Sequence, residues 1–220
     1  MTVRRIPSSY HSSLTKRSFD LAFSLISTIM LSPLLILILL AVKVTSPGPA
    51  FFIQKRIGKN GNVFKLIKFR TMKTGSEKLQ GRYKQFNEAD GPVFKIVDDP
   101  RLTRFGRFLA HTGLDELPQL INVLRGDMSL VGPRPLPLYE ARKLAKSERV
   151  RELVKPGITS RWVVQGSHRL KFNEWMKLDE DYVKNASFLT DLTILAKTVL
   201  IMLKQTARQT FNLLNFQNFS

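Results

Sequence analysis

Residues 21–42 read LAFSLISTIMLSPLLILILLAV and contain no charged side chain. A straight helix over these 22 residues would be roughly 33 Å long, which matches the hydrocarbon core of a bilayer. Ser32-Pro33 stands in the middle of the run, and a proline there removes a helix hydrogen bond and bends the helix. The run therefore predicts a membrane helix that is kinked at Ser32-Pro33.

Both flanks of this apolar run are basic. The flanking cations are Arg4, Arg5, Lys16 and Arg17 before it, and Lys43, Lys55, Arg56, Lys59, Lys65, Lys68, Arg70 and Lys73 after it. The positive-inside rule would keep both flanks on the cytoplasmic side of a membrane. The residues alone leave two topologies open: a kinked helix that spans the bilayer, or a re-entrant helix that bends and leaves on the face by which it entered.

The composition narrows the classes of partner and of site. The chain has 220 residues, with 35 Lys and Arg against 17 Asp and Glu, a net charge of +18. Such an excess favours a polyanionic partner, which is a nucleic acid, an anionic membrane surface or a phosphorylated substrate. The absence of cysteine excludes disulfides and thiolate chemistry, and three histidines argue against a multi-histidine metal site.

The rest of the chain predicts an α+β fold that is mainly helical. Residues 50–56 and 63–70 are β-prone, and Asn60-Gly61 between them is a strong signal for a hairpin turn. The polar stretch 74–91 is expected to be a mobile loop with one helical turn. Further helices are expected over residues 101–110, 117–124, 136–154 and 188–202.

Two of these helices carry an open alternative. The helix over 101–110 alternates basic and apolar residues, so it lies either at a membrane surface as an amphipathic interfacial helix or on the soluble core. The helix over 188–202 is too polar to span a membrane and is either interfacial or part of the core. The predicted organisation is a basic N-terminus and membrane helix (1–45), a cytoplasmic catalytic domain (46–203) and a C-terminal tail without clear order (204–220).

The adjacent carboxylates Asp115 and Glu116 are the leading candidates for chemistry. They precede Leu117-Pro118, and proline is tolerated in the first turn of a helix, so Asp115 is expected near a helix N-cap. A purely structural acidic pair at a helix start would look the same. Neighbours on a helix point about 100° apart, which suits two different roles better than a glycosidase pair. A carboxylate can also attack phosphorus and form an acyl phosphate.

Arg134 stands between Pro133 and Pro135, which restrict its backbone. A guanidinium group binds phosphate oxygens in a bidentate manner, so Arg134 is a candidate phosphate ligand. A rigid surface turn is the alternative. The turn Asp98-Asp99-Pro100-Arg101 is expected to be structural rather than metal-binding.

Several ordered motifs resemble those of the bacterial sugar transferases in the monotopic phosphoglycosyl transferase superfamily. They cover roughly residues 16–203 and stand in the family's order. They are residues 16–20 (KRSFD), 32–33 (SP), 46–49 (SPGP), 68–72 (KFRTM), 114–120 (LDELPQL), 131–135 (VGPRP) and 155–159 (KPGIT).

The resemblance implies an activity. Such enzymes transfer a sugar phosphate from a UDP-sugar to undecaprenyl phosphate, release UMP, and so initiate a surface polysaccharide or glycoconjugate. It implies that Asp115 is the nucleophile, that Glu116 assists it, and that Mg²⁺ is held partly by Asp115. It also implies a re-entrant helix at Ser32-Pro33 in the bacterial inner membrane, with the catalytic domain on the cytoplasmic face and anionic lipids as partners.

The substrate-binding residues expected on this basis are Lys68, Arg70, Arg101, Arg107, Pro133, Arg134 and Pro135. Family members commonly have a basic pair and a serine just before the dyad, whereas this chain has Ala110-His111-Thr112-Gly113. Arg107 or His111 is the expected replacement. Residues 182–185 (YVKN), followed by Asp191, resemble members that handle hexoses such as glucose or galactose.

Two other classes of function are weighed against this one. The charge of +18 would suit a nucleic-acid-binding membrane protein, but no nucleic-acid motif accompanies it, and no nucleic-acid partner is expected. The departure at Ala110 would suit a non-catalytic membrane scaffold. An oligomer is compatible with either class.

Overall fold

A computed structural model of the chain describes residues 7–166 and 170–217, so Arg4 and Arg5 lie outside the described residues. The α-helices are α1 (Leu14–Met30), α2 (Ser32–Thr45), α3 (Arg104–Thr112), α4 (Gln119–Arg125), α5 (Leu138–Ala141), α6 (Arg161–Val164), α7 (Phe172–Asn185) and α8 (Phe188–Gln217). The 3₁₀ helices are η1 (Ser9–Ser12), η2 (Lys59–Gly61), η3 (Ser76–Phe86), η4 (Leu114–Glu116) and η5 (Glu148–Leu153). The strands are β1 (Phe51–Ile57), β2 (Val63–Phe69), β3 (Ser129–Val131) and β4 (Gly157–Thr159). The prediction of a mainly helical α+β fold is confirmed.

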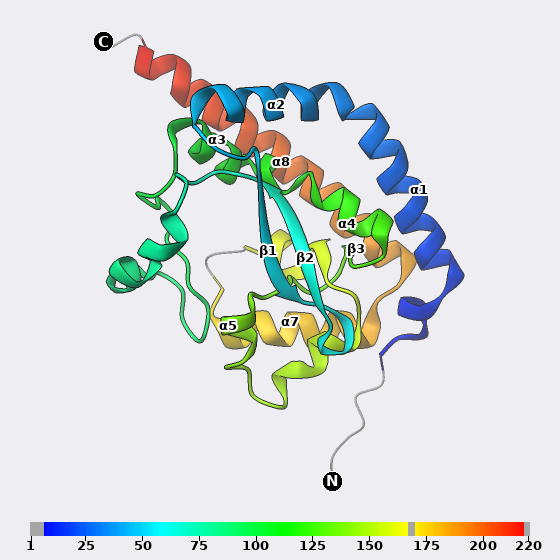
Figure 1. Cartoon of the computed structure of the whole chain (residues 1–220). Helices are drawn as coiled ribbons and strands as arrows, with labels where there is room; N and C mark the ends of the chain where they lie inside the picture. Colours follow the sequence, from blue (N-terminus) through cyan, green and yellow to red (C-terminus); the bar gives the residue numbers. More distant parts are fainter. Residues whose placement is uncertain (1–6, 167–169, 218–220) are drawn as a thin grey trace.

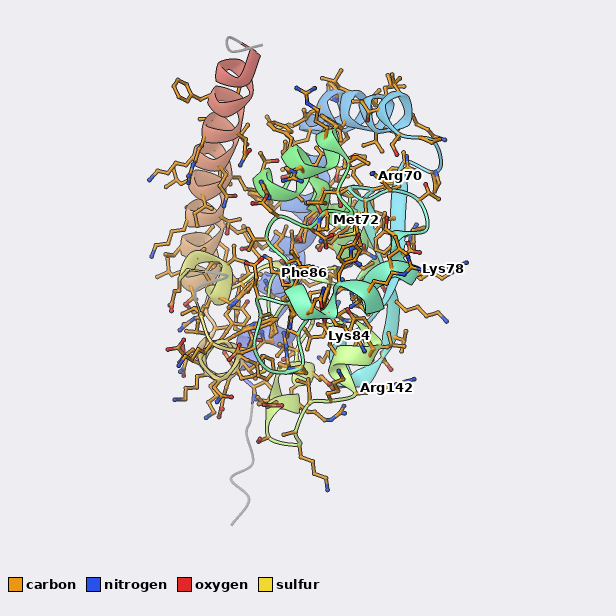
Figure 2. All side chains as sticks on the ribbon, turned by 90° about the vertical axis from the view of Figure 1, so that its left-hand side faces the viewer. Arg70, Met72, Lys78, Lys84, Phe86 and Arg142 are labelled. Carbon is orange, nitrogen blue, oxygen red and sulfur yellow. The ribbon has the colours of Figure 1, made fainter. Side chains whose placement is uncertain are left out.

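Helices α1 and α2 frame two edges of the molecule in Figure 1, with the β1–β2 hairpin in front of α8. Figure 2, turned by 90°, places η3 on the near face and α8 at the edge opposite the hairpin. The elements between these edges carry the candidate site. The apolar run is therefore a border of the fold rather than its centre.

The predicted kink is confirmed. Helices α1 and α2 meet at Leu31 with a bend of 62°. Pro33 has no N–H to donate, and the hydroxyl of Ser32 donates to the carbonyl of Ile29 at 2.8 Å. Among the described helices, no single one is long and apolar enough to cross a bilayer, but the bent pair passes that test together.

The outer surface of the bent pair is apolar. Its exposed large side chains are Phe23, Leu25, Ile26, Ile29, Met30, Leu34, Ile36, Leu37, Leu40 and Val44. On the inner side of α2, Ile38 and Val42 are buried against Phe69 and Leu109. The α3 helix therefore packs on the core through Leu109, which is one of the two positions expected for the helix over residues 101–110. An exposed apolar surface of this extent marks an interaction site.

The predicted hairpin is confirmed. β1 and β2 pair antiparallel, with Phe51 opposite Phe69 and Ile57 opposite Val63. Asn60 (φ 56°) and Gly61 (φ 77°) both lie in the left-handed region that the turn between the strands requires. The register places Lys68 on β2 and Arg56 on β1 on one face of the hairpin.

Three predictions about local structure are wrong. Residues 136–154 do not form one helix, because Glu140 and Arg151 turn inward and bind backbone groups of Phe94 and Arg134. Stretch 74–91 contains η3 rather than a single turn. The tail predicted to lack order is helical as far as Gln217, while residues 218–220 lie outside the described part.

The short parallel pair β3–β4 was missed. Its strands have three residues each, too few to show a period. Gly132 follows β3 and faces Gly157 on β4 so closely that a Cβ on Gly157 would lie 2.0 Å from the Gly132 nitrogen. Glycine at both positions therefore permits the backbones to approach.

A buried ion-pair network fixes α1 to α8. Lys16 Nζ lies 3.1 Å from Asp20 Oδ1 on the same helix and 2.5 Å from Asp191 Oδ2 on α8. All three side chains are nearly inaccessible to solvent. One ammonium group thus compensates two buried carboxylates across 175 residues of sequence.

The same network holds β3. The hydroxyl of Tyr182 lies 2.7 Å from Asp191 Oδ1 and 2.9 Å from the carbonyl oxygen of Val131. The backbone N–H of Leu130 donates to Asp20 Oδ1 at 3.2 Å. The strand that leads into Gly132-Pro133-Arg134 is therefore anchored to α1, α7 and α8 at once.

Replacing Lys16 should destabilise the fold strongly. K16M leaves the carboxylates of Asp20 and Asp191 buried without their cation, which we expect to lower the free energy of unfolding by about 3–5 kcal/mol. The matched control is K184M, because Lys184 pairs with Glu180 at the surface, and such pairs contribute about 0–1 kcal/mol. Chemical unfolding in detergent measures both, and equal stability of the two variants would contradict the assignment.

Candidate active site

Asp115 and Glu116 lie on η4, immediately after Gly113. Gly113 adopts φ 77°, a left-handed conformation that ends α3 and starts η4. The N-cap of α4 is Pro118, so the expectation that Asp115 sits near the N-cap of that helix is wrong. The 3₁₀ turn directs the dyad toward β2 instead. Asp115 is 8% exposed, and the pKa of a carboxyl group so buried depends strongly on the charges near it.

Two cations contact the dyad, and they are Lys68 and Arg134, which the sequence proposed as substrate-binding residues. Lys68 Nζ donates to Glu116 Oε1 at 2.5 Å and lies 3.6 Å from Asp115 Oδ2. Arg134 Nη2 donates to the same Glu116 oxygen at 3.1 Å. Glu116 therefore has two direct cationic partners, whereas Asp115 has a longer contact to one of them.

The two carboxyl groups differ in pKa as a result. Burial raises the pKa of Asp115 to about 6, and the charge of Lys68 opposes the rise only in part. Burial would also raise the pKa of Glu116, but the charges of Arg134 and Lys68 outweigh it and hold that pKa well below its usual range. Glu116 is thus ionised at any physiological pH, and Asp115 becomes a carboxylate as the pH rises through about 6.

Every backbone carbonyl of the segment that presents Arg134 is held by another element. The Pro133 carbonyl accepts from the N–H of Gly157 at 3.0 Å. The Arg134 carbonyl accepts from the guanidinium of Arg151, and the Pro135 carbonyl accepts from Arg56 Nη1 at 2.9 Å. The proline-flanked turn is therefore rigid, as predicted, and it aims Arg134 at the dyad.

Arg56 is a site residue that the sequence reasoning missed. It lines one narrow cleft with Lys68, Glu116 and Arg134, and its Nε is buried without a hydrogen-bond partner. Burial, followed by the charge of Arg134, lowers the pKa of Arg56 to about 10. Its place on the same hairpin face as Lys68 was the available signal, although a basic strand residue on its own is common.

Lys95 is a second cation that was missed. Burial lowers its pKa to about 7, and the charges that act on it next are those of Arg134, Glu116 and Lys68. Its backbone is fixed by Asn87, whose Oδ1 accepts from the Lys95 N–H at 2.7 Å. No motif identified this residue in the sequence.

Arg70 and Arg101 bind groups other than the dyad in the described contacts. Arg70 donates to the carbonyls of Ser46 at 2.6 Å and Pro47 at 2.7 Å, and so fastens the end of α2 to the hairpin. Arg101 forms a buried pair with Asp99 at 2.5 Å, which supports the structural reading of that turn. Both guanidinium groups are already engaged by these partners.

Arg107 and His111, the expected replacements for the missing basic pair, contact Asp98 rather than the dyad. Arg107 Nη1 lies 3.0 Å from Asp98 Oδ1, and His111 Nε2 lies 3.6 Å from the same oxygen. Asp98 is well exposed, with 68% of its side chain accessible. Neither contact joins Arg107 or His111 to Asp115, so Lys68 and Arg134 are the cations that the described contacts bring to the dyad.

The dyad fits a hard divalent cation only in part. Within residues 7–166 and 170–217, no group of three or more His, Cys, Asp or Glu side chains could hold a metal ion. Mg²⁺, however, is commonly bound by one or two carboxylates together with substrate phosphates and water. The adjacent Asp115 and Glu116 suit a site of that kind, but they do not suit one in which protein side chains supply all the ligands.

Comparison with known proteins places this geometry in context. The sequence model of the family described as bacterial sugar transferase matches residues 11–205. The galactosyl transferase CpsE of Streptococcus agalactiae serotype III is 36% identical over 198 residues, covering 90% of this chain and 44% of its own length. The exopolysaccharide production protein ExoY of Sinorhizobium fredii is 37% identical over 190 residues, covering 84% of each.

A third relative is the undecaprenyl-phosphate galactose phosphotransferase of Salmonella typhimurium. It is 39% identical over 199 residues, covering 86% of this chain and 40% of its own length. The chain thus spans about two fifths of the length of two of these relatives and most of the length of the third.

The position of Lys68 predicts the titration of Asp115. Since the charge of Lys68 lowers the pKa of Asp115 against the effect of burial, K68M should raise that pKa above about 6. The carboxyl C=O band, followed by infrared difference spectroscopy across pH and assigned with D115N, measures it. K73M is the control, because Lys73 is an exposed lysine that immediately follows the motif at residues 68–72. An unchanged titration in K68M would contradict the electrostatic account of the dyad.

Proposed function

The chain belongs to the bacterial sugar transferase family, and on that premise we propose that it transfers a sugar 1-phosphate from a UDP-sugar to undecaprenyl phosphate, releasing UMP. The observation that carries the proposal is the pairing of a buried, weakly compensated Asp115 with a Glu116 that binds two cations. Such an arrangement supplies a nucleophile and a phosphate-binding charge in one cleft.

In the first half-reaction, a carboxylate oxygen of Asp115 attacks the phosphorus that carries the sugar. The new Asp115 O–P bond forms as the bond from that phosphorus to the bridging oxygen breaks, and the bridging oxygen leaves with UMP. The product is an aspartyl-phosphosugar. A pKa of about 6 leaves Asp115 mainly ionised at neutral pH, and its longer contact to Lys68 leaves it freer to react than Glu116.

In the second half-reaction, a phosphate oxygen of undecaprenyl phosphate attacks the same phosphorus. The bond to Asp115 breaks, and the carboxylate is regenerated as the polyprenyl diphosphate sugar forms. Because UMP leaves before undecaprenyl phosphate reacts, and Asp115 carries the sugar phosphate in between, the kinetics should be ping-pong. The two half-reactions together would initiate exopolysaccharide, capsule, O-antigen or glycoconjugate synthesis.

Lys68 and Arg134 serve both states of this cycle. In the absence of substrate they neutralise Glu116. With the diphosphate bound, their remaining N–H groups face phosphate oxygens, and Arg134 offers the flat fork that such oxygens fit. Glu116 then keeps both cations in place rather than reacting itself.

Mg²⁺ is the cation that this chemistry calls for. Asp115, with Glu116 adjacent, would hold it together with substrate phosphates, and when bound it would neutralise charge on the diphosphate. The chain's own part is to present the carboxylates on a rigid 3₁₀ turn.

The bent pair α1–α2 is proposed to enter the bacterial inner membrane and leave on the same, cytoplasmic face. Each arm has 17 or 14 residues, and the exposed apolar side chains gather around the bend. The bend of 62° and the basic residues on both flanks support re-entry over spanning. Anionic lipids would be attracted to those flanks.

We propose a hexose as the sugar, with galactose and glucose as the leading candidates. The support is the resemblance at residues 182–185 and the relatives whose names specify galactose. Tyr182 and Asp191 themselves bond to each other in the interior, so they would act on sugar choice only through the fold.

The activity is tested by incubating detergent-solubilised protein with Mg²⁺, undecaprenyl phosphate and a panel of UDP-sugars, and measuring UMP. We expect UMP release with a UDP-hexose and a loss of at least about a thousandfold in D115N, because the nucleophile is removed. D98N is the control, since Asp98 is exposed and its described ion pairs are with Arg107 and His111 rather than with the cations of the dyad. A folded protein silent across the panel would exclude the enzyme, and wild-type turnover in D115N would remove Asp115 from its role.

Topology is tested by single cysteines in a chain that has none. S12C before α1 and N62C in the hairpin occupy exposed positions, and both should react with an impermeant maleimide from the cytoplasmic side only. L37C, on the exposed face of α2, should react poorly because lipid covers it. Labelling of S12C and N62C from opposite sides would establish a spanning helix instead.

A further inference from the structure

We infer that Arg151, acting through a stack of two tryptophans, orients Arg134 for binding a phosphate of the nucleotide-sugar. The inference rests on the proposed function and adds positioning residues to it: Arg151, Trp175 and Trp162. These residues lie on η5, α7 and α6, and none of them contacts the dyad directly in the described contacts.

The four side chains form a continuous stack. The guanidinium carbon of Arg134 lies 5.8 Å from the centre of the Trp162 ring. The Trp162 and Trp175 rings are stacked, with centroids 4.8 Å apart and planes inclined by 25°. The guanidinium carbon of Arg151 lies 5.0 Å from the centre of the Trp175 ring. Two cations thus bracket two indoles at distances within which cation–π attraction acts.

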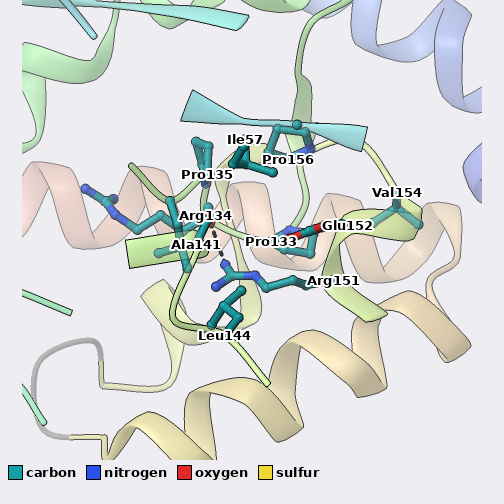
Figure 3. Close-up of a pocket in the computed structure, with 12 residues that line it drawn as sticks. Ile57, Pro133, Arg134, Pro135, Ala141, Leu144, Arg151, Glu152, Val154 and Pro156 are labelled. Atoms are coloured by element: carbon teal, nitrogen blue, oxygen red, sulfur yellow. Dashed lines mark hydrogen bonds between the residues drawn. The ribbon is translucent and has the colours of Figure 1, made fainter. Parts of the chain in front are cut away.

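The stack closes on itself through the backbone. The guanidinium of Arg151 donates to the carbonyl of Arg134, the hydrogen bond drawn between these residues in Figure 3. Asp179 lies 3.0 Å from Arg151 and compensates its charge. Arg134 is therefore held at its backbone by Arg151 and at its side chain by Trp162.

Burial makes these contacts strong. Trp162 is 8% exposed and Trp175 is 5% exposed, and a cation–π contact gains when water is excluded from it. Arg151 and Asp179 are equally buried. The Arg134 side chain, in contrast, keeps 32% of its surface accessible, so its free edge can still receive a ligand.

This geometry assigns each part of the Arg134 guanidinium a function. The guanidinium lies over the Trp162 ring, its Nη2 donates to Glu116, and the other N–H groups are the ones offered to phosphate oxygens. Without the indole face, the side chain would sample several rotamers, and each binding event would have to restrict it again. Since residues 110–113 supply no compensating cation at the dyad, that loss would fall directly on phosphate affinity.

The test uses full-length protein in detergent with UMP as the binding probe and the UDP-hexose that supports turnover as the substrate. W162L should raise the dissociation constant of UMP and the KM for the UDP-sugar roughly tenfold, the size of a partly buried cation–π contact, and leave kcat within about threefold. W162F keeps an aromatic face and should recover most of the loss. The control is F172L, because Phe172 packs on Trp175 edge to face at 5.9 Å without contacting Arg134.

The contribution of Arg134 is isolated by a double-mutant cycle. In an R134A background, W162L should no longer change UMP affinity, whereas a general packing defect would persist there. Thermal unfolding of each variant separates misfolding from misorientation. Equal effects of W162L and F172L on UMP affinity would overturn the inference, and so would a W162L effect that persists without Arg134. In either case, UMP release by the wild type would leave the proposed function standing. A wild type that neither binds UMP nor releases it would overturn both.

Discussion

The fold depends on one buried ammonium group, that of Lys16, which compensates Asp20 on its own helix and Asp191 on α8. Charges in the interior are tolerated only when they are paired and hydrogen-bonded. Because Asp20 and the Asp191 partner Tyr182 also bind the backbone of β3, the network that docks the apolar helix also fixes the strand leading to Arg134. The apolar border and the candidate site are therefore parts of one rigid unit rather than two modules.

Inside the site, unequal compensation separates two neighbouring carboxylates. Lys68 and Arg134 converge on a single oxygen of Glu116, so that residue remains ionised and holds both cations. Asp115 is the more buried of the two and receives less positive charge, and its pKa rises to about 6. Pairs of acids whose surroundings push their pKa values apart are typical of catalytic sites, in which each acid has its own role.

The sequence predicted the elements whose signals are local. A proline inside an apolar run predicted the bend at Leu31, Asn60-Gly61 predicted the hairpin turn, and the motifs around Asp115 and Arg134 predicted residues that the fold brings together. What escaped depends on distant partners. The strands β3 and β4 are too short to show a period. Glu140 and Arg151 point inward and bind backbone groups of other segments, where one continuous helix had been expected. Helix α8 extends further than expected, and its half-buried Met202 and Gln209 pack beside α3. Arg56 and Lys95 were missed because their relation to the dyad exists only in three dimensions.

The central claim is that Asp115 carries the sugar phosphate between donor and acceptor. The most direct measurement is the intact mass of the wild-type protein mixed with the UDP-sugar and Mg²⁺ in the absence of undecaprenyl phosphate, followed by peptide mapping. We expect a mass increase equal to one sugar phosphate on the peptide that contains Asp115, with release of one equivalent of UMP. The adduct should disappear when undecaprenyl phosphate is added. An unmodified protein that nevertheless turns over with both substrates present would show direct displacement and contradict the account.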